Sequence, residues 1–323
     1  MAISIVVPIF NEEETIPELY RRLCGVLKNT EPGSEVVFIN DGSRDRSFEL
    51  LADLAKRDSR IKVINLSRNF GHQIAITAGM DYARGDAVVI IDADLQDPPE
   101  VIHELVAKWH EGYDVVYAVR ESREGETIFK KLTASAFYRL IAKITNVDIP
   151  VDTGDFRLMS RTAVEAFKRI REKNRFVRGL VSWLGFRQTG VKFKRNERFA
   201  GETKYPLKKM LKFALDGITS FSFLPLQLAT YLGFLVSAFS FVALAIIVVH
   251  KLLTPQYGVT GWASMMAVIL FLGGVQLITI GLIGEYIGRI YDEVKQRPLY
   301  FTQQILGFDE GTSWHSTERT ALV

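Results

Sequence analysis

The segment VVIIDADLQDPPE, residues 88–100, places four carboxylates within nine positions directly after an apolar run. Asp92 and Asp94 are two residues apart, and in an extended chain such residues point to the same side. Two carboxylates on one side repel each other unless a cation or another partner lies between them. Carboxylate oxygens suit Mg²⁺ or Mn²⁺, which commonly take one or two of them together with substrate phosphates. The pair therefore predicts a divalent-metal site, provided that it follows a buried strand and is not part of a surface loop.

The other two acids of the segment have a different pattern. Asp97 is followed by two prolines and then by Glu100. An aspartate at the N-cap, a proline at the first helical position and a glutamate three residues after the aspartate are typical of a helix start. We therefore expect Asp97 and Glu100 to be structural residues that begin a helix and take no part in chemistry.

The first 120 residues alternate between short apolar runs and helical patterns, which predicts an α/β domain with a mostly parallel sheet. The expected strands are Ile3–Val7, Val36–Ile39, Ile61–Leu66, Ala87–Ile91 and Val115–Ala118, and the expected helices are Thr15–Lys28, Ser47–Arg57, His72–Ala83 and Pro99–Glu111. The near-continuous valine and isoleucine runs fit strands that are covered on both faces. Ligands of such sheets lie beyond the carboxyl ends of the strands. Polar clusters follow four of these runs, at Asn11, Asp41, Asn69 and Asp92.

The composition excludes several classes of protein. The chain has 323 residues, enough for at least one full core, and its net charge of +3 argues against general nucleic-acid binding. The single cysteine, Cys24, rules out an intrachain disulfide and a thiolate metal cluster, and it suits a reducing compartment. There is no G-x-G-x-x-G and no G-x-x-x-x-G-K-[ST], so a bound nucleotide must be held in another way.

Two stretches are long and apolar enough to cross a bilayer. Residues 225–249 carry no charge, and neither do residues 262–284; each stretch exceeds the roughly 20 apolar residues that a spanning helix needs. Two buried core helices are the weaker alternative, because helices that are apolar all round belong in lipid. Basic residues are frequent before the first stretch and after the second, and the loop between them holds one lysine. The positive-inside rule then places the head and the C-terminal tail together in the cytoplasm.

These patterns predict four parts: a catalytic domain over residues 1–205, an interfacial amphipathic segment over 206–224, a transmembrane hairpin over 225–290 with spans at about 225–249 and 262–287, and a cytoplasmic tail over 291–323. The interfacial segment has an apolar stripe at helical spacing with Lys208, Lys209 and Lys212 on its other face, which favours a helix lying in the membrane surface. A core helix of the head is the alternative. We expect an integral protein of the plasma (inner) membrane.

Several motifs in the same order resemble one family. The segments VVPIFNEEE, INDGSRD, DADLQDPPE, GDFRL and RFAGETKY look like the family 2 glycosyltransferases of GT-A fold, and more narrowly like the polyprenyl-phosphate glycosyltransferases. The segment GLIGEYIGRIYDEVKQRPLY is similar to the bacterial members. The resemblance runs from residue 3 to about residue 300. It implies transfer of a sugar from a nucleotide sugar to a membrane polyprenyl phosphate of the undecaprenyl type.

The resemblance also implies roles for individual residues. Nucleotide-sugar binding falls to Pro8, Phe10, Glu12, Asp41, Asp92, Ala93 and Arg120, with Asp41 bonding the base. The divalent ion, Mg²⁺ or Mn²⁺, would lie among Asp92, Asp94 and Gln96. The catalytic set would be Asp94, Asp155, Arg198 and Lys204. Arginine offers paired donors to phosphate and lysine a point charge, although Arg198 and Lys204 also suit attraction to anionic lipid.

The chemistry that follows is a single in-line displacement with inversion, in which most of the catalysis is positioning and charge stabilisation. A lipid phosphate is already anionic, so no base is obligatory. Asp155 therefore has a positioning role, with a structural loop acid as an almost equal alternative. His72 invites a catalytic interpretation, but a histidine at a helix start is more often structural. UDP-glucose is the first choice of donor, and GDP-mannose and UDP-formamidoarabinose stay open.

Two other functions compete with this one. A processive polysaccharide synthase would carry a Q-x-x-R-W signature and more spans, and the sequence has neither. A transport protein with a nucleotide-binding head would need ionisable groups inside its spans, and the two stretches supply none. Gly284 and Gly288 form a small-xxx-small pair. We expect a homo-oligomer from it, with packing inside the hairpin as an equally natural alternative.

Overall fold

The computed structural model describes residues 1–121, 153–195, 224–253 and 261–308, which fall into two units. The first unit contains Met1–Lys209 and Arg297–Val323, and the second is Met210–Gln296. The predicted interfacial segment, 206–224, lies almost wholly outside the described residues. Each unit is described by itself.

The first unit is built on one sheet whose strands meet in the order β7-β5-β6-β4-β1-β2-β3-β8. The strands are β1 (Ile3–Ile9), β2 (Glu35–Asn40), β3 (Ile61–Leu66), β4 (Ala87–Ile90), β5 (Val115–Arg120), β6 (Thr153–Ser160), β7 (Gln188–Phe193) and β8 (Thr302–Leu306). Strands β1 to β4 pair in parallel. Strand β6 runs antiparallel between β4 and β5, and β8 runs antiparallel along β3. The predicted α/β domain with a mostly parallel sheet is confirmed.

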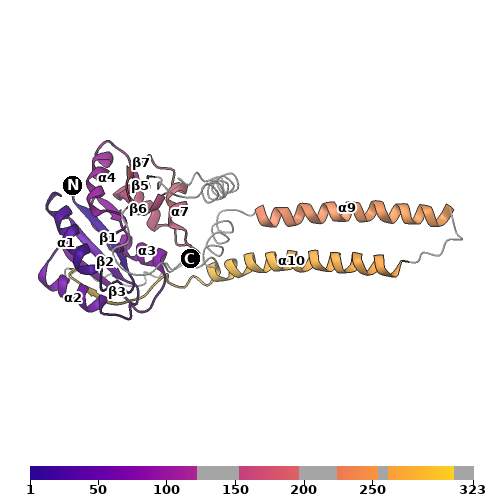
Figure 1. Ribbon diagram of the computed structural model, residues 1–323, viewed down its shortest axis with the longest axis horizontal. Coiled ribbons are helices and arrows are strands. Elements are labelled where there is room, and N and C mark those ends of the chain that lie inside the picture. The colour runs from indigo at the N-terminus through magenta and orange to yellow at the C-terminus, as the bar shows by residue number, and fades with distance from the viewer. Residues whose placement is uncertain (122–152, 196–223, 254–260, 309–323) are drawn as a thin grey trace, which may run out of the picture. The chain divides into compact units, whose positions relative to one another are not determined.

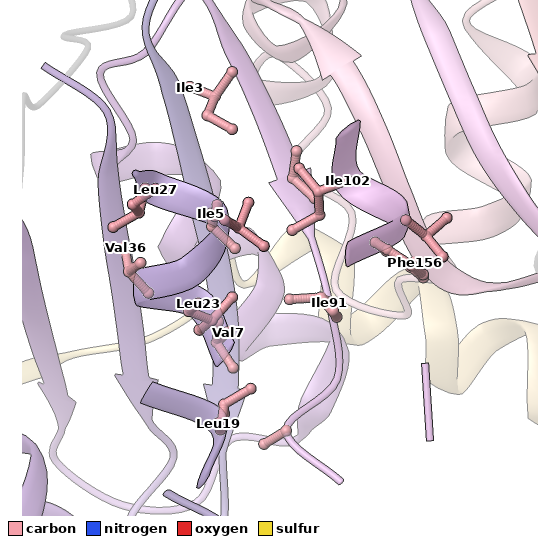
Figure 2. Close-up of a cluster of buried hydrophobic side chains, with 14 of the residues drawn as sticks. Ile3, Ile5, Val7, Leu19, Leu23, Leu27, Val36, Ile91, Ile102 and Phe156 are labelled. Atoms are coloured by element: carbon pink, nitrogen blue, oxygen red, sulfur yellow. The ribbon is translucent and has the colours of Figure 1, made fainter. Parts of the chain in front are cut away.

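Helices cover both faces of this sheet (Figure 1). The helices of this unit are α1 (Ile16–Leu27), α2 (Ser47–Arg57), α3 (His72–Tyr82), the short 3₁₀ helix η1 (Pro99–Val101), α4 (Ile102–His110), α6 (Arg161–Lys168) and α7 (Val177–Trp183). The apolar sides of α1 and α4 pack on the odd-numbered residues of β1, as Figure 2 shows for Leu19, Leu23 and Ile102 around Ile5 and Val7. Because each fully buried aliphatic side chain contributes about 1.5–3 kcal/mol, this core fixes the sheet on which the polar loops stand.

The opposite face of the sheet is covered by α3, which packs very closely on β1 and β2. Residues 75–80 of α3 are all buried. A Cβ atom added at Gly79 would clash with Val6 and would lie 2.6 Å from the Cδ1 atom of Ile39. Glycine at this position therefore sets the distance between the helix and the sheet.

The segment after residue 297 returns to the first unit as an eighth strand, which the sequence did not predict. Strand β8 pairs with β3, and the amide of Ser67 donates to the carbonyl oxygen of Phe301 at 2.9 Å. The hydroxyl of Tyr300 donates to Asp81 at 2.8 Å, and the rings of Tyr82 and Phe308 meet edge-on. Residues 300–308 are thus attached to the head by strand pairing and by side-chain contacts.

The second unit is a helical hairpin, α9 (Leu224–Leu253) and α10 (Trp262–Val294), whose two helices lie side by side (Figure 1). Within them Leu226–Ile247 and Val268–Val294 are long and apolar enough to cross a membrane, and these windows are not buried. The two stretches expected to span the bilayer are therefore helices that expose apolar side chains all round, as lipid-facing helices do.

The glycine in α3 provides a test of this packing. We expect Gly79→Ala to lower the stability of the head by about 1–3 kcal/mol, because the new methyl group overpacks a closed interface. Gly25 lies in an exposed position of α1 with nothing within 4 Å of an added Cβ. Gly25→Ala should instead stabilise by about 0.5–1 kcal/mol.

The apparent Tm of the purified protein in detergent, followed by tryptophan fluorescence, measures both effects. A Tm that moves in the same direction in both variants would contradict the tight contact between α3 and the sheet.

Candidate active site

The carboxyl ends of β1 and β4 lie next to each other, although the chain passes through β2 and β3 between them. Strand β2 follows β1 on one side and β4 lies on the other, so the connections diverge at this point of the sheet. A parallel sheet binds its ligand at such a switch point. The polar residues after β1, beginning with Asn11, and the acids after β4, beginning with Asp92, are thereby brought to one edge.

Strand β6 adds a further acid to that edge. Ala87 of β4 pairs with Ser160 and Ile90 pairs with Arg157, so the same register continued by two residues sets Asp92 opposite Asp155. Side chains alternate along β6: Phe156 joins the core on the α1 side of the sheet, and Asp155 lies on the α3 side, where it contacts α3 and α7. The antiparallel strand therefore brings a second acid to face the one that ends β4.

Asp155 is buried in a network of donors. Arg178 of α7 donates to its Oδ1 at 2.9 Å and approaches its Oδ2 at 3.5 Å. Gln73 of α3 donates to Oδ2 at 3.2 Å and accepts the amide of Val177 at 2.8 Å. Burial alone would raise the pKa of Asp155, but Arg178 and His72 outweigh it and hold that pKa well below its usual range. The carboxylate is thus a permanent anion that ties α3, β6 and α7 together.

His72 connects this network to Asp92. Its Nε2 lies 3.2 Å from Oδ2 of Asp155 and 3.4 Å from Oδ1 of Asp92. Burial opposes protonation of the imidazole, but the hydrogen bond to Asp155 and the charges of both carboxylates raise its pKa to about 9. His72 is therefore an imidazolium between two carboxylates at neutral pH, and it belongs to the site, where sequence reasoning had favoured a structural helix-start residue.

Asp92 is an acid whose charge the described residues compensate only in part. Burial raises its pKa to about 6; His72 lowers it, while Asp155, Asp97 and Asp94 add to the rise. Its Oδ1 is buried and has no hydrogen-bond partner among the described residues. Such an oxygen, beside a second carboxylate at Asp94, fits a divalent cation. The described residues contain no group of three metal-ligating side chains, and Mg²⁺ and Mn²⁺ commonly complete their shells with substrate phosphates.

Asp97 does not begin a helix, which corrects the prediction made for it. Pro98 is extended, as a residue before proline tends to be, so η1 starts at Pro99 without a side-chain cap. Asp97 is instead 1% exposed, and its oxygens lie 3.4 Å from Arg120 and 3.6 Å from Arg195. Burial raises its pKa, and the two guanidinium groups oppose that rise. Glu100 is structural as expected, because it pairs with Arg22 of α1.

The two arginines stand beside the acids of the predicted metal site. Arg120 ends β5, and its buried Nε has no hydrogen-bond partner among the residues that the structure describes. Gly154 makes room for it, because a Cβ atom there would lie 2.6 Å from the Nη2 atom of Arg120. Arg195 follows β7 and donates to Oε1 of Gln96 at 2.5 Å, while the amide of Gln96 donates to Asp94 at 3.1 Å. Arg120 and Arg195 thus lie among the acids at the ends of β4, β5 and β7.

The loop after β1 forms the other side of the site. Pro8 is buried within β1, Phe10 is 40% exposed, and Glu12 accepts a hydrogen bond from the hydroxyl of Thr15 at 3.1 Å. Asn11 adopts a positive φ of 55° and is bonded on both sides: its amide donates to Ser43 and its side chain accepts the amide of Arg44. The loops after β1 and β2 are therefore joined, and Phe10 projects an exposed ring suited to stacking.

Asp41, at the end of β2, receives two backbone hydrogen bonds, from the amide of Phe70 at 2.7 Å and from that of Gly71 at 3.0 Å. Burial raises its pKa and these two donors oppose the rise. These two donors use two of the about four acceptor positions of a carboxylate. Recognition of a base by Asp41 stays a prediction. Gly42, at φ +65°, packs against the backbone of Arg68 and Asn69.

Two members of the predicted catalytic set, Arg198 and Lys204, lie outside the described residues. The structure brings together Asp92, Ala93, Asp94, Gln96, Arg120 and Asp155 at one edge, and it places Pro8, Phe10, Glu12 and Asp41 on the adjoining loops. The role of each residue stays a prediction.

Comparison with known proteins decides the family. Residues 4–167 match the description of glycosyl transferase family 2, and residues 224–290 match that of the GtrB C-terminal hairpin. The chain belongs to glycosyltransferase family 2. It is a glycosyltransferase, and the α/β domain with its mostly parallel sheet is the GT-A-like fold that the motifs implied.

Three relatives illustrate the match. An uncharacterized glycosyltransferase, YkcC of Bacillus subtilis, is 58% identical to this glycosyltransferase over 95% of this chain and 94% of its own. A prophage bactoprenol glucosyl transferase homolog of Escherichia coli is 45% identical over 94% of this chain and 99% of its own. Among solved structures, glucosyl-3-phosphoglycerate synthase from Mycobacterium tuberculosis is 20% identical, with a TM-score of 0.47 over 68% of this chain and 78% of its own.

Four site residues of the transferase had no role in the sequence analysis, or a lesser one: Gln73, Arg178, Arg195 and His72. His72 and Gln73 begin the helix that follows the loop after β3, whose amides donate to Asp41. A helix start at the carboxyl edge of the sheet is a signal by which both residues could have been predicted as site residues. Arg178 and Arg195 could not be found in this way, because they reach the site through α7 and β7, whose sequences carry no motif.

The network around Asp155 predicts a large structural penalty for its loss. Asp155→Asn keeps the shape but removes the carboxylate charge that pairs with Arg178 and acts on the buried Arg157, and breaking a buried ion pair typically costs about 3–5 kcal/mol. The apparent Tm of the transferase should therefore fall together with its activity.

Asp53→Asn, which breaks only an exposed pair with Lys56, should change stability by less than about 0.5 kcal/mol. An Asp155→Asn protein with unchanged Tm and no activity would show that the carboxylate is a chemical group and that its structural contribution is small.

Proposed function

We propose that this glycosyltransferase moves glucose from UDP-glucose to a membrane polyprenyl phosphate, with inversion and with the help of a divalent ion. The observation that carries the proposal is the pair Asp92 and Asp94 beside the arginines Arg120 and Arg195, at the switch point of the sheet, where Oδ1 of Asp92 has no hydrogen-bond partner among the described residues. Such a mixture of acids and guanidinium groups suits a metal–pyrophosphate group. The name of the Escherichia coli relative, a bactoprenol glucosyl transferase homolog, supports the sugar and the lipid acceptor.

The donor would lie across the loops after β1 and β2, with its base near Phe10 and Asp41 and its pyrophosphate toward Asp92 and Asp94. A bound Mg²⁺ or Mn²⁺ would supply charge stabilisation for the leaving diphosphate. Gln96 has a carbonyl oxygen close to the same place, where it now accepts from Arg195. Arg120, with its unsatisfied Nε, would donate to a phosphate oxygen.

The acceptor in this proposal needs no base. A polyprenyl phosphate is an anion at neutral pH, so its oxygen attacks the anomeric carbon without losing a proton. Asp155, whose carboxylate receives donors from three side chains and whose pKa is strongly lowered, is poorly suited to take up a proton. We assign it a positioning role, in line with the sequence expectation.

The two candidate spanning helices would hold the enzyme at the plasma membrane, with the head and the tail in the cytoplasm. We also propose a homo-oligomer. Gly284 and Gly288 of α10 have nothing within 4 Å of an added Cβ among the described residues, so the described hairpin does not use their close-packing capacity. The alternative, packing inside the hairpin alone, would leave a single copy in detergent.

A radiolabelled transfer assay tests the reaction. The full-length protein in detergent is supplied with undecaprenyl phosphate and UDP-glucose, GDP-mannose or UDP-formamidoarabinose, with and without Mg²⁺ or Mn²⁺. We expect metal-dependent label in the lipid phase from UDP-glucose. Asp94→Ala should lose at least about 100-fold in rate, as loss of one preorganised charge-stabilising group does, whereas Asp53→Ala should be unaffected.

Label from another nucleotide sugar would correct the donor and keep the acceptor. Tight nucleotide binding without transfer to lipid phosphate in any arm would overturn the lipid-acceptor proposal.

Gly154 offers a test of Arg120 that leaves the arginine in place. Gly154→Ala puts a methyl group where the guanidinium now lies, so the phosphate donor is displaced by a few tenths of an ångström or more. We expect the KM for the nucleotide sugar to rise about tenfold, the effect of roughly one weakened charge-assisted hydrogen bond. Gly25→Ala is the matched control, and a KM equal to that of the wild type would contradict a phosphate contact by Arg120.

A further inference from the structure

The position of His72 depends on β2 as well as on its own helix, α3. It is the first residue of α3, and the two residues before it donate their amides to Asp41 at the end of β2. Gly71, at φ +100°, makes the turn from this loop into the helix. The imidazole is therefore carried by a backbone that is bonded to the sheet on one side and continues into a buried helix on the other.

The imidazole lies between two carboxylates that face each other across β4 and β6. Its Nε2 is within 3.2 Å of Asp155 and 3.4 Å of Asp92, and the His72 side chain is 41% exposed while those of Asp155 and Asp92 are 4% and 27% exposed. Among the described residues His72 is the ion-pair partner of Asp92, and Oδ1 of Asp92 has no hydrogen bond. Nε2 of His72 therefore lies between the two acids, within reach of both.

Asp155 is a fixed point for this bridge. Arg178 and Gln73 hold it from α7 and α3, and the carbonyl oxygen of Asp155 also accepts from the buried Arg157. Asp92, by contrast, follows β4 directly, and among the described residues its Oδ1 has no hydrogen-bond donor. A group that contacts both carboxylates therefore restrains the orientation of Asp92 relative to the fixed Asp155.

We propose that His72 is a positioning residue that holds the carboxylate of Asp92 in the orientation required to bind the divalent ion of the nucleotide sugar, by bridging it to the Arg178-clamped Asp155. The inference rests on the proposed function, and it deepens it by assigning a supporting residue to the metal site. It resembles the support that carboxylate ligands commonly receive from a second layer of hydrogen bonds.

The geometry of the bridge distinguishes between two substitutions of similar polarity. The amide nitrogen of a glutamine reaches about as far from the backbone as Nε2 of histidine does, and the amide nitrogen of an asparagine reaches only as far as Nδ1. His72→Gln therefore keeps a donor between Asp92 and Asp155, and His72→Asn does not. A residue with a merely structural role at the helix start would tolerate both amides about equally.

The test measures Mn²⁺ binding to the purified full-length protein in detergent, in the presence of UDP, by electron paramagnetic resonance. We expect His72→Asn and His72→Ala to weaken Mn²⁺ binding about 10-fold or more, as loss of such support typically does, and His72→Gln to stay within about threefold of the wild type. The metal concentration that half-saturates transfer should rise in the same order, with a smaller change in kcat at saturating metal. His110→Asn, at an exposed position of α4, is the control.

Equal Mn²⁺ affinity in the asparagine and glutamine variants would overturn the inference, even if the alanine variant failed to fold. The apparent Tm of each variant separates a loss of binding from a loss of structure. An absence of Mn²⁺ binding in the wild type would instead overturn the proposed metal site, and this inference with it, whereas normal wild-type binding with no effect of any His72 variant would overturn the inference alone.

Discussion

The balance of charge at the carboxyl edge of the sheet governs the arrangement of the site. Four aspartates, at positions 92, 94, 97 and 155, lie there: Asp94, Asp97 and Asp155 all raise the pKa of Asp92, and Asp94 also raises the pKa of Asp97. The protein supplies its own cations to three of them: Arg178 to Asp155, Arg120 and Arg195 to Asp97, and His72 to both Asp155 and Asp92. Asp92 nevertheless keeps a raised pKa, and its Oδ1 has no hydrogen-bond partner in the part of the chain that the structure describes. This distribution of charge supports the proposed binding of a divalent cation at Asp92 and Asp94.

The sheet topology makes this concentration of charge possible. A purely parallel sheet would bring only strand ends to this edge, but β6 runs antiparallel and therefore begins where β4 ends. Its first residues, Gly154 and Asp155, contribute a space for Arg120 and a partner for His72. Strands β5 and β7 then end beside it with the two arginines that hold Asp97. The departure from parallel order is thus what assembles the charged groups.

Much of the fold could be predicted from the sequence, because Val/Ile runs and helical spacing are strong local signals. The helix Ser47–Arg57 and the strand Ile61–Leu66 were predicted with the bounds that they have in the structure. The Asp97 prediction failed because a capping signature depends only on neighbouring residues. The same sequence is compatible with a buried aspartate that pairs with two arginines distant in the chain, as Asp97 does. Strand β8 was missed for a related reason: TQQIL is short and polar, and its pairing with β3 depends on partners more than 230 residues earlier in the chain.

That missed strand changes how the scaffold of the site is understood. Helix α3 presents His72 and Gln73 at its first turn, and Asp41 fixes that end through the preceding loop. At the other end Asp81 is held by Arg171 and by the hydroxyl of Tyr300, and Tyr82 meets the ring of Phe308. The helix between is buried and closely packed at Gly79, so α3 is held by contacts at both ends and along its length. Residues 300–308, which follow the hairpin in sequence, are therefore part of the scaffold that positions the charged groups.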